Sequence, residues 1–326
     1  MQSLWYAFLS TTRKAHMYIG ILTTNQVDED KRFIEAATKH GHTVKLLHLL
    51  KCSMSVCPDN AEIFYEGENI NDTFDVIIPR LNVSYTGYGL AILRQFQALD
   101  VYVTDTAYSI ELGRDKLRCL QYLMRKGIPF PKTGFSDSKD DFNNIINTVG
   151  GTPMIIKLNE GTEGTGVFLV DDVKQAENIM GTFKQFDEAI ISQEFISESS
   201  GTDLRCFVVG KEIVATMKRE SQDGDFRSNV SLGGHSSSEE LSKEERDTVL
   251  KSAEAIGLNI AGVDLIRSGH GPLIIEINTS PDFCGEQGIE SVTGIDVAGA
   301  IIDYAVKGKK LYDDGKGVWL QEKKAS

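Results

Sequence analysis

Two carboxylates and an amide in the last quarter of the chain have the types and spacing expected of a divalent metal site. Asp264 lies in Gly-Val-Asp-Leu-Ile, whereas Glu276 and Asn278 lie in Leu-Ile-Ile-Glu-Ile-Asn. Residues two apart on a strand share a face, so Glu276 and Asn278 are expected to point the same way. A turn centred near His270 would place Asp264 opposite Glu276 on the neighbouring strand.

The apolar setting of these side chains predicts that they hold cations. The flanking residues are Leu265, Ile266, Ile274, Ile275 and Ile277. Two carboxylates ~4 Å apart repel by about 4 kcal/mol at an effective dielectric constant of about 20, which a shared proton or a cation relieves. An all-oxygen set is what Mg²⁺ or Mn²⁺ prefers, and two such ions about 3.5–4 Å apart bridge a triphosphate. The alternative, a polar sheet face in water, is disfavoured by the apolar neighbours.

A lysine at the end of a predicted strand leads into a glycine-rich loop that suits phosphate. The segment starts at Lys157 and contains Gly161, Gly164 and Gly166. Glycine lets the backbone point its N–H groups at phosphate oxygens, and the lysine adds a positive charge. The segment is not a Walker loop, because no Gly-Lys-Ser/Thr follows. Taken alone, a hairpin turn without a ligand is an equally good interpretation.

Two arginines lie close to aspartates in the same half of the chain. They are Arg205 in Asp203-Leu-Arg205 and Arg227 in Asp225-Phe-Arg227. In each case the two charged residues flank an apolar one, so their side chains can share a strand face. Such arginines can neutralise phosphate or a substrate carboxylate. From these residues alone, however, ordinary salt bridges are the favoured interpretation.

The residues before position 113 predict a parallel α/β unit that must position part of this chemistry. An apolar run at 18–23, a helical pattern at 28–40 and a strand at 43–49 together give β-α-β. Further strands are expected at 74–79 and 101–104, with a helix at 88–99. The turn after the first strand has no Gly-x-Gly-x-x-Gly, so dinucleotide binding there is unsupported.

From residue 114 onward, helices alternate with hairpins, which predicts α+β units with antiparallel sheets. Helices are expected at 114–126, 137–148, 173–186 and 242–256. Strands are expected at 154–157, 167–170, 189–196, 203–209 and 212–217, followed by a hairpin from 261 to 277. Ser236, in Ser-Ser-Ser-Glu-Glu, is expected to lie in an exposed loop.

Composition narrows the class of protein. The 326 residues carry a net charge of −13, which argues against broad attraction to nucleic acid. Five dispersed cysteines indicate no disulfide framework and fit a reducing cytoplasm. No apolar run approaches the roughly 20 residues that span a bilayer.

Residues 1–16 make a poor signal peptide, and we expect an extension or a start codon placed before a true start at Met17. Peptide mapping of the protein from its natural host tests this.

The order of these motifs resembles the ATP-grasp superfamily and, within it, the RimK-type α-L-glutamate ligases. The matching motifs are Lys157 with its glycine-rich loop, Gln193-Glu-Phe, Gly201-Thr-Asp-Leu-Arg, Gly224-Asp-Phe-Arg-Ser-Asn, Gly262-Val-Asp and Glu276-Ile-Asn-Thr-Ser-Pro. The resemblance extends from Met17 to about Lys307. It implies an N-terminal α/β domain over 17–112, a central lid subdomain over 113–191, a catalytic subdomain with an antiparallel sheet over 192–308, and a tail over 309–326.

The resemblance also implies a role for each site residue. The ATP phosphates would be held by Lys116, Lys157, Arg227, Ser228 and Asn229. The loop that contains Gly161, Gly164 and Gly166 would form a lid over them. Glu194 and Phe195 would flank the adenine, and Asp203 would approach the ribose. Two Mg²⁺ or Mn²⁺ ions would be bound by Asp264, Glu276 and Asn278. Arg205 would steady an acyl phosphate, and Arg205 and Arg227 are the candidate catalytic residues.

The implied activity is that of a cytoplasmic, homo-oligomeric ligase joining L-glutamate to a carboxylate, such as the C-terminus of a ribosomal protein. One segment departs from the family pattern: residues 279–290 are a few residues longer, with Asp282 in place of glycine. This departure leaves open an ATP-grasp ligase that makes a small peptide or a glutamylated cofactor. A nucleotide-binding regulator without turnover is the third alternative, and the complete set of metal ligands disfavours it.

Overall fold

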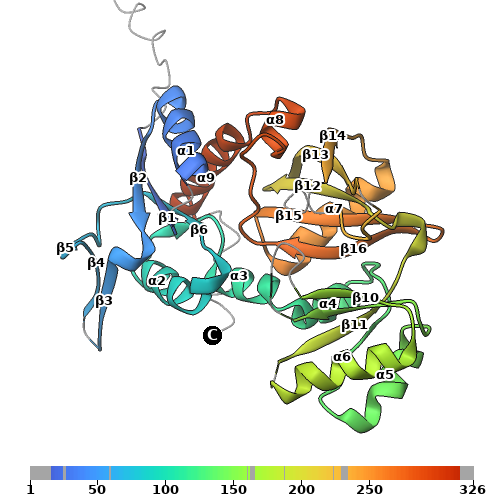
Figure 1. The fold of residues 1–326 in the computed structure, drawn as a ribbon. Helices are drawn as coiled ribbons and strands as arrows, with labels where there is room; N and C mark the ends of the chain where they lie inside the picture. Colours follow the sequence, from blue (N-terminus) through green and yellow to red (C-terminus); the bar gives the residue numbers. More distant parts are fainter. Residues whose placement is uncertain are drawn as a thin grey trace, which may run out of the picture.

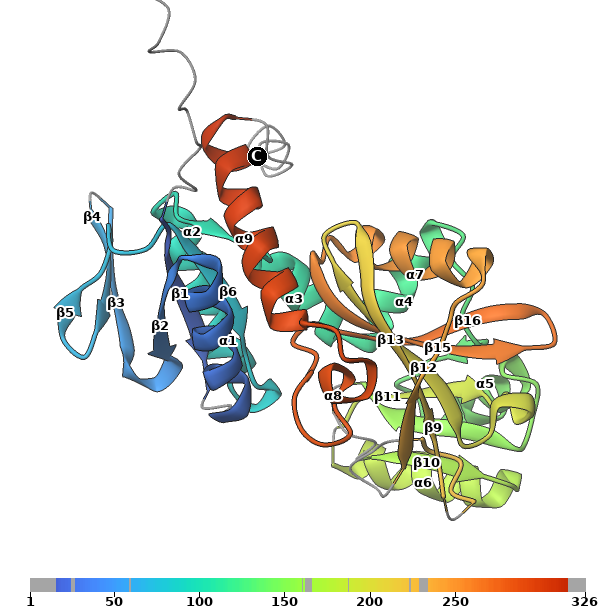
Figure 2. The same cartoon turned by 90° about the horizontal axis from the view of Figure 1, so that it is seen from above.

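The computed structural model describes residues 16–24, 27–58, 60–159, 161, 166–186, 188–222, 224–228 and 234–315. Within these ranges the chain forms four sheets, and Figures 1 and 2 show them as an N-terminal layer on one side and two stacked sheets on the other. In the same ranges every helix is too short or too polar to span a bilayer.

The N-terminal domain is built around a parallel sheet with strand order β2-β1-β6-β7. Its strands are β1 (Tyr18–Thr23), β2 (Thr43–His48), β6 (Val76–Arg80) and β7 (Tyr102–Val103). The helices that pack on it are α1 (Val27–His40), α2 (Thr86–Ala98) and, from the end of the chain, α9 (Val297–Asp313). The predicted β-α-β unit is therefore confirmed, with the apolar strands covered on both faces as a parallel sheet requires.

Two parts of this domain differ from the sequence prediction. A small antiparallel sheet of β3 (Cys52–Cys57), β4 (Asn60–Tyr65) and β5 (Glu68–Asn69) projects beside the domain and was not predicted. A helix α3 (Ala107–Arg114), capped by the Thr106 hydroxyl, precedes α4 (Lys116–Arg125). Asp115 lies between these two helices and caps α4. The helix predicted to begin at residue 114 therefore begins at Lys116.

The central subdomain is a four-stranded antiparallel sheet covered by two helices. Its strand order is β10-β9-β11-β8, with β8 (Thr133–Gly134), β9 (Met154–Leu158), β10 (Val167–Val170) and β11 (Ile190–Glu194). The helices are α5 (Phe142–Thr148) and α6 (Val173–Gln185), whose apolar faces pack on the sheet. The expected helix at 137–148 is shorter, because a 3₁₀ turn (Lys139–Asp141) comes first.

The C-terminal subdomain is a five-stranded antiparallel sheet with strand order β14-β13-β12-β15-β16. The strands are β12 (Thr202–Val209), β13 (Glu212–Glu220), β14 (His235–Ser238), β15 (Ile260–Ser268) and β16 (Gly271–Asn278), with α7 (Lys243–Ile256) against the sheet. The expectation of an exposed loop at Ser236 is wrong. Ser236 pairs with Arg219 across the sheet and is 5% exposed, because the polar serine run adds an edge strand to β13.

Two irregularities in this sheet decide which residues face each other. The register of β12 and β13 shifts by one residue after Phe207, so Asp203 lies opposite Arg219. The register of β15 and β16 also shifts, so that Asp264 lies opposite Glu276 while Leu265 lies opposite Ile274. The predicted opposition of Asp264 and Glu276 is confirmed, but it depends on this bulge, because Ser268 pairs with Gly271 at the turn.

Phe283 joins the N-terminal and C-terminal parts of the chain. It lies between β16 and the short helix α8 (Ile289–Thr293), and its ring is fully buried. It meets Phe33 of α1 at 5.4 Å and Phe207 of β12 at 6.0 Å, both edge to face. Aromatic edge-to-face pairs add about 0.5–1.5 kcal/mol beyond the burial of apolar area. The segment after β16 is therefore anchored in the core that both parts share.

We expect Phe283→Ala to lower the free energy of unfolding by about 3–5 kcal/mol, as removal of a buried aromatic ring does. Urea unfolding followed by far-ultraviolet circular dichroism measures it. Phe186→Ala is the matched control, because this phenylalanine is 73% exposed; it should change stability by less than about 0.5 kcal/mol. Equal effects of the two substitutions would contradict the anchoring role of Phe283.

Candidate active site

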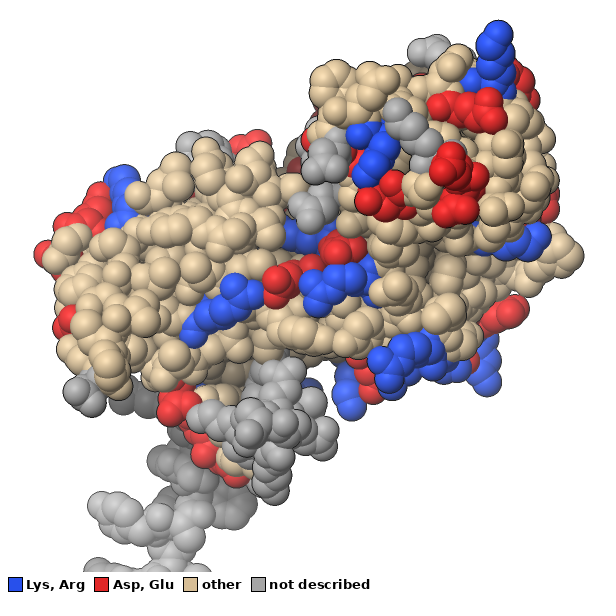
Figure 3. Space-filling model, turned by 90° about the horizontal axis from the view of Figure 1, so that it is seen from below, with Lys and Arg blue, Asp and Glu red and all other residues tan. Residues whose placement is uncertain are grey.

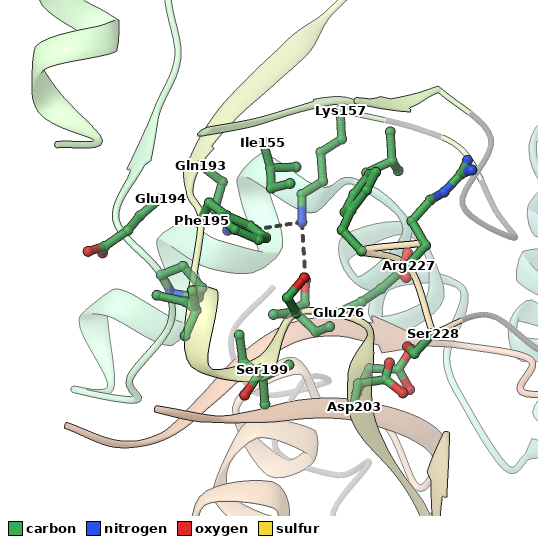
Figure 4. A pocket seen from close by; sticks show the side chains of 18 of the residues that line it. Ile155, Lys157, Gln193, Glu194, Phe195, Ser199, Asp203, Arg227, Ser228 and Glu276 are labelled. Carbon is green, nitrogen blue, oxygen red and sulfur yellow. Dashed lines mark hydrogen bonds between the residues drawn. The ribbon is translucent and has the colours of Figure 1, made fainter. Parts of the chain in front are cut away.

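A deep pocket lies between the central sheet and the C-terminal sheet. The strand β9 contributes Lys157, the end of β11 and the residue after it contribute Glu194 and Phe195, and β16 contributes Glu276. In Figure 4, Lys157 points into this pocket between Phe195 on one side and Arg227 on the other. Its walls therefore bring together residues from both halves of the predicted nucleotide site.

Lys157 is a buried cation held at the centre of the pocket. Its Nζ donates to Gln193 Oε1 at 2.9 Å and to the carbonyl of Ile275, the residue at the β16 bulge, at 3.4 Å. Gln193 is itself oriented by donating from Nε2 to Thr133 Oγ1. Burial lowers the pKa of Lys157 to about 8; the neighbouring Lys116 adds to this shift, and Glu276 opposes it.

Lys116 approaches the same space from the first turn of α4. Its Nζ donates to the carbonyl of Gly161 at 3.0 Å and lies 3.3 Å from Glu276 Oε1. The Asp115 side chain caps the helix and so fixes its start. Lys116 and Lys157 thus place two positive charges beside Glu276, as an anionic ligand would require.

Asp264 is the most constrained of the predicted metal ligands. Arg205 donates to both of its oxygens, at 2.8 and 2.7 Å, and Arg219 Nη2 lies 3.1 Å from its Oδ2. Asn278 Nδ2 also donates to Asp264 Oδ2, at 3.2 Å. Burial alone would raise the pKa of Asp264, but the two guanidinium groups outweigh it and hold the pKa at about 2.

These contacts bring the three predicted metal ligands to one place. Asp264 and Asn278 are bonded to each other, and Glu276 is directly opposite Asp264 in the sheet. In the described ranges no three His, Cys, Asp or Glu side chains gather into a ligand set. A metal at this place would therefore have the Asn278 amide oxygen as its third protein ligand. Carboxylate and amide oxygens together suit Mg²⁺ or Mn²⁺.

Asp203 and Arg205 lie two apart on β12 and reach the same cluster of charges, as the predicted shared face requires, but each pairs with a residue of another strand. Asp203 is buried and accepts from Arg219 Nε at 2.7 Å and from Arg219 Nη2. Arg219 therefore links Asp203 to Asp264, and the sequence analysis missed it. An unbroken hairpin turning at Gly210 would have put Lys218 opposite Asp203, and only the bulge brings Arg219 there. The only indication of this role in the sequence was that Arg219 lies on the strand predicted to pair with that of Asp203 and had no assigned partner.

Asp225 and Arg227, the second predicted pair, form the expected salt bridge. Arg227 donates to Asp225 from Nη2 at 2.8 Å, and both side chains are about one-third exposed. Arg227 and the buried Ser228 line the pocket, as do Glu194, Phe195 and Gly161. Gly166, directly before β10, has φ 72°, a backbone conformation that favours glycine. The predicted site residues Gly164 and Asn229 lie outside the described residues.

A second cavity of about 570 Å³ adjoins the first. It lies between the N-terminal domain and the segment after β16, with walls at residues 81–86 and 279–288. Four residues line both cavities: Lys116, Gly161, Arg219 and Glu276. Arg205 and Asn278 line only the second. The predicted metal ligands thus stand at the boundary between the two cavities.

The surface around the two cavities carries charges of both signs. In Figure 3, Lys and Arg side chains alternate with Asp and Glu along a band across the middle of one face, and most of the neighbouring surface is uncharged. Binding to a nucleic-acid backbone draws on clustered Lys and Arg. The net charge of −13 argues against such binding.

Comparison with known proteins matches nearly the whole chain to one family. A family model described as the RimK PreATP-grasp domain matches residues 17–110, and one described as the RimK-like ATP-grasp domain matches residues 113–305. The chain belongs to the RimK-like ATP-grasp family. It is 45% identical over 305 residues to a probable α-L-glutamate ligase of Hydrogenovibrio crunogenus, covering 92% of this chain and 100% of that protein.

Solved structures agree on the fold. The RimK domain ATP-grasp protein of Sphaerobacter thermophilus matches with a TM-score of 0.67 and 21% identity, over 88% of this chain and 99% of that one. The ATP-grasp ligase PsnB, complexed with a phosphomimetic variant of its minimal precursor, Mg and ADP, matches with a TM-score of 0.68 and 16% identity, over 90% and 99%. These likenesses confirm the predicted ATP-grasp architecture.

Membership of the RimK-like family settles the class of reaction. The protein is an ATP-dependent ligase that forms amide bonds, and not the regulator without turnover that the sequence left open. ATP use together with divalent metal ions follows from the ATP-grasp family. The first cavity contains the buried Lys157, a cation of the kind that phosphate groups require.

Nucleotide affinity should fall as the pH rises from 7 to 9.5. In the free protein the pKa of Lys157 is about 8, so the cation is lost across this range. A bound triphosphate favours the charged lysine, so binding takes up a proton and weakens once the free lysine is neutral. Calorimetric titration with ADP and Mg²⁺ at several pH values measures this. Lys157→Arg is the control, because arginine stays charged and should remove the dependence. The same slope in both proteins would contradict the assignment.

Proposed function

We propose that this RimK-like protein is an α-L-glutamate ligase that activates a carboxylate with ATP and couples it to the amine of glutamate. The observation that carries the proposal is the meeting of the two cavities at Glu276, with Asp264 and Asn278 beside it. A triphosphate in the first cavity and a carboxylate in the second would come together at these side chains.

The reaction has two displacement steps. A carboxylate oxygen attacks the γ-phosphoryl group of ATP, the bond to ADP breaks, and an acyl phosphate forms. The amine nitrogen of glutamate then attacks the carbonyl carbon, phosphate leaves, and the nitrogen loses a proton to give an amide. Both steps gather negative charge on phosphoryl oxygens, which fixed cations stabilise.

The residues present fit a pair of divalent cations. Asp264, Glu276 and Asn278 supply the oxygen donors, and Asp264 is charged at neutral pH. Bound Mg²⁺ or Mn²⁺ would offset the charge of the triphosphate and of the leaving ADP. Lys116 and the arginines that now contact these carboxylates would be free to turn toward the phosphates.

The remaining pocket residues would each contact a different part of the nucleotide. Lys116, Lys157, Arg227 and Ser228 would hold phosphates, and Arg205, which lines the substrate cavity, would steady the acyl phosphate. Glu194 ends β11 and Phe195 follows it, where the chain passes between the two sheets, and both would flank the adenine. Asp203 remains a proposed ribose contact, and through Arg219 it also orients Asp264.

Glutamate is proposed as the amine because the relatives at about 45% identity carry the name α-L-glutamate ligase. The proposed acceptor is a protein C-terminus, such as that of a ribosomal protein. The ATP-grasp ligase PsnB, which shares this fold, was solved with its precursor peptide PsnA2, and this supports a peptide or protein as the acceptor. A small peptide or cofactor as the acceptor is the alternative.

Purified protein incubated with ATP, Mg²⁺ and L-glutamate, with and without extract of its host, tests the proposal. Phosphate release and intact masses of the extract proteins are followed. An added mass of about 129 Da per glutamyl residue on one protein, as the amide coupling requires, would support a protein acceptor. Phosphate release without a protein shift would favour the small-molecule acceptor. No glutamate-dependent phosphate release under either condition would overturn the choice of glutamate.

Glu276→Gln should lower turnover at least a hundredfold while leaving the protein folded. The substitution keeps the size of the side chain but removes the charge beside Lys116, and metal-dependent phosphoryl transfer depends on such ligands. Steady-state phosphate release measures turnover, and circular dichroism checks the fold. Glu254→Gln, on the exposed side of α7, is the matched control and should keep full activity. Wild-type turnover in Glu276→Gln would remove Glu276 from the metal site.

A further inference from the structure

Three consecutive residues after the last predicted metal ligand each accept a hydrogen bond from the N-terminal domain or from the end of α3, the helix that leads out of it. Arg114 Nε donates to Thr279 Oγ1 at 3.2 Å, and the backbone N–H of Leu81 donates to Ser280 Oγ at 3.2 Å. Arg80 Nη2 donates to the carbonyl of Pro281 at 2.6 Å. We call these six residues (Arg80, Leu81, Arg114, Thr279, Ser280 and Pro281) the interdomain clamp.

Arg80 is held in place by a buried ion pair. Its guanidinium donates to both oxygens of Glu29, and the two side chains are 1% and 3% exposed. Burial raises the pKa of Glu29 to about 7, against the opposing effect of Arg80. The guanidinium also lies over the ring of Phe283, at 5.6 Å. Because removing two charges from water costs free energy, a buried ion pair need not stabilise the fold. In this structure the pair holds Arg80 in the position from which it donates to the Pro281 carbonyl.

Arg114 connects both sides of the second cavity. Besides Thr279, it donates to the carbonyl of Asn82 at 3.2 Å, to the carbonyl of Leu81 and to the Thr86 hydroxyl. All of these acceptors except Thr279 belong to the N-terminal wall of the cavity. One rigid guanidinium therefore sets the distance between that wall and the segment after Asn278.

Two glycines show how closely this segment is seated. A Cβ on Gly113 would lie 2.6 Å from Thr279 Cγ2, and a Cβ on Gly262 would lie 2.6 Å from Pro281 Cβ. Separations under about 3 Å are repulsive between carbon atoms, whose optimum is about 3.5–4.0 Å. The segment is thus enclosed between α3 and β15 as well as hydrogen-bonded.

The clamp belongs to one cavity and not to the other. Five of its six residues line the second cavity, and none of them lines the nucleotide pocket. The clamp also begins at the residue after Asn278 and continues into residues 282–288, which complete the cavity wall. A shift of this segment would change the shape of the second cavity while leaving Lys157, Glu194 and Phe195 where they are.

We propose that Arg80 and Arg114 are positioning residues that set the shape of the second cavity through residues 279–281 and so govern binding of the carboxylate and amine substrates, independently of ATP. This inference rests on the proposed function, in which that cavity takes those two substrates. It also assigns the N-terminal domain a part in substrate selection.

Thr279→Val tests the clamp with little risk to the fold, because it keeps the shape of a buried side chain and removes only the acceptor for Arg114 Nε. With L-glutamate supplied as both amine and carboxylate, we expect KM for glutamate to rise roughly fivefold to tenfold, the size of one lost hydrogen bond. The Kd for ADP with Mg²⁺ and the melting temperature should stay close to those of the unaltered protein. Thr279→Ser keeps the hydroxyl and should restore KM.

Thr38→Val is the matched control, since this exposed threonine only bonds within α1. Amide hydrogen exchange in the unliganded protein provides a second readout, and exchange over residues 281–290 should rise in Thr279→Val alone. If Thr279→Val changes neither KM for glutamate nor hydrogen exchange, the proposed role of the clamp is wrong. It is also wrong if the Kd for ADP rises by the same factor as KM. If the unaltered protein does not turn over glutamate, the proposed function fails, and the exchange experiment still decides whether the clamp orders this segment.

Discussion

The arrangement of the site depends on one buried carboxylate, Asp264, and on the two arginines that neutralise it. A carboxylate fully removed from water would take up a proton unless cations compensate it. Arg205 and Arg219 provide that compensation from the neighbouring strands β12 and β13, and they keep the pKa of Asp264 at about 2. Three strands of the C-terminal sheet must therefore keep their register for the charge to persist.

Two bulges supply that register. One moves Arg219 opposite Asp203, and the other moves Glu276 opposite Asp264. The second also exposes the carbonyl of Ile275, which accepts from Lys157 of the central sheet. An extra residue in a strand disrupts the ladder locally and redirects side chains, and bulges are common beside active sites for this reason. Here they connect the metal ligands to the lysine of the facing sheet.

The two cavities are formed by different structural units. The central and C-terminal sheets form the cavity proposed for ATP, while the N-terminal domain and the segment after β16 form the other cavity. Lys116 and Glu276 belong to both and lie 3.3 Å apart. The N-terminal parallel sheet ends at Arg80, so the carboxyl edge of that sheet faces the second cavity. This edge is where open α/β sheets usually bind ligands.

The sequence by itself determined the local elements and the ligands that lie close together along the chain. Apolar runs and periodicity located β1 and α7, and alternation along β16 placed Glu276 and Asn278 on one face. The sequence did not predict Arg80, Arg114 or Arg219 as site residues. Arg80 and Arg114 find their partners in residues 279–281, which are more than 160 positions away. Arg219 reaches Asp203 only through a bulge. Such contacts depend on docking and register, which spacing along the chain does not encode, so only the tertiary structure decided them.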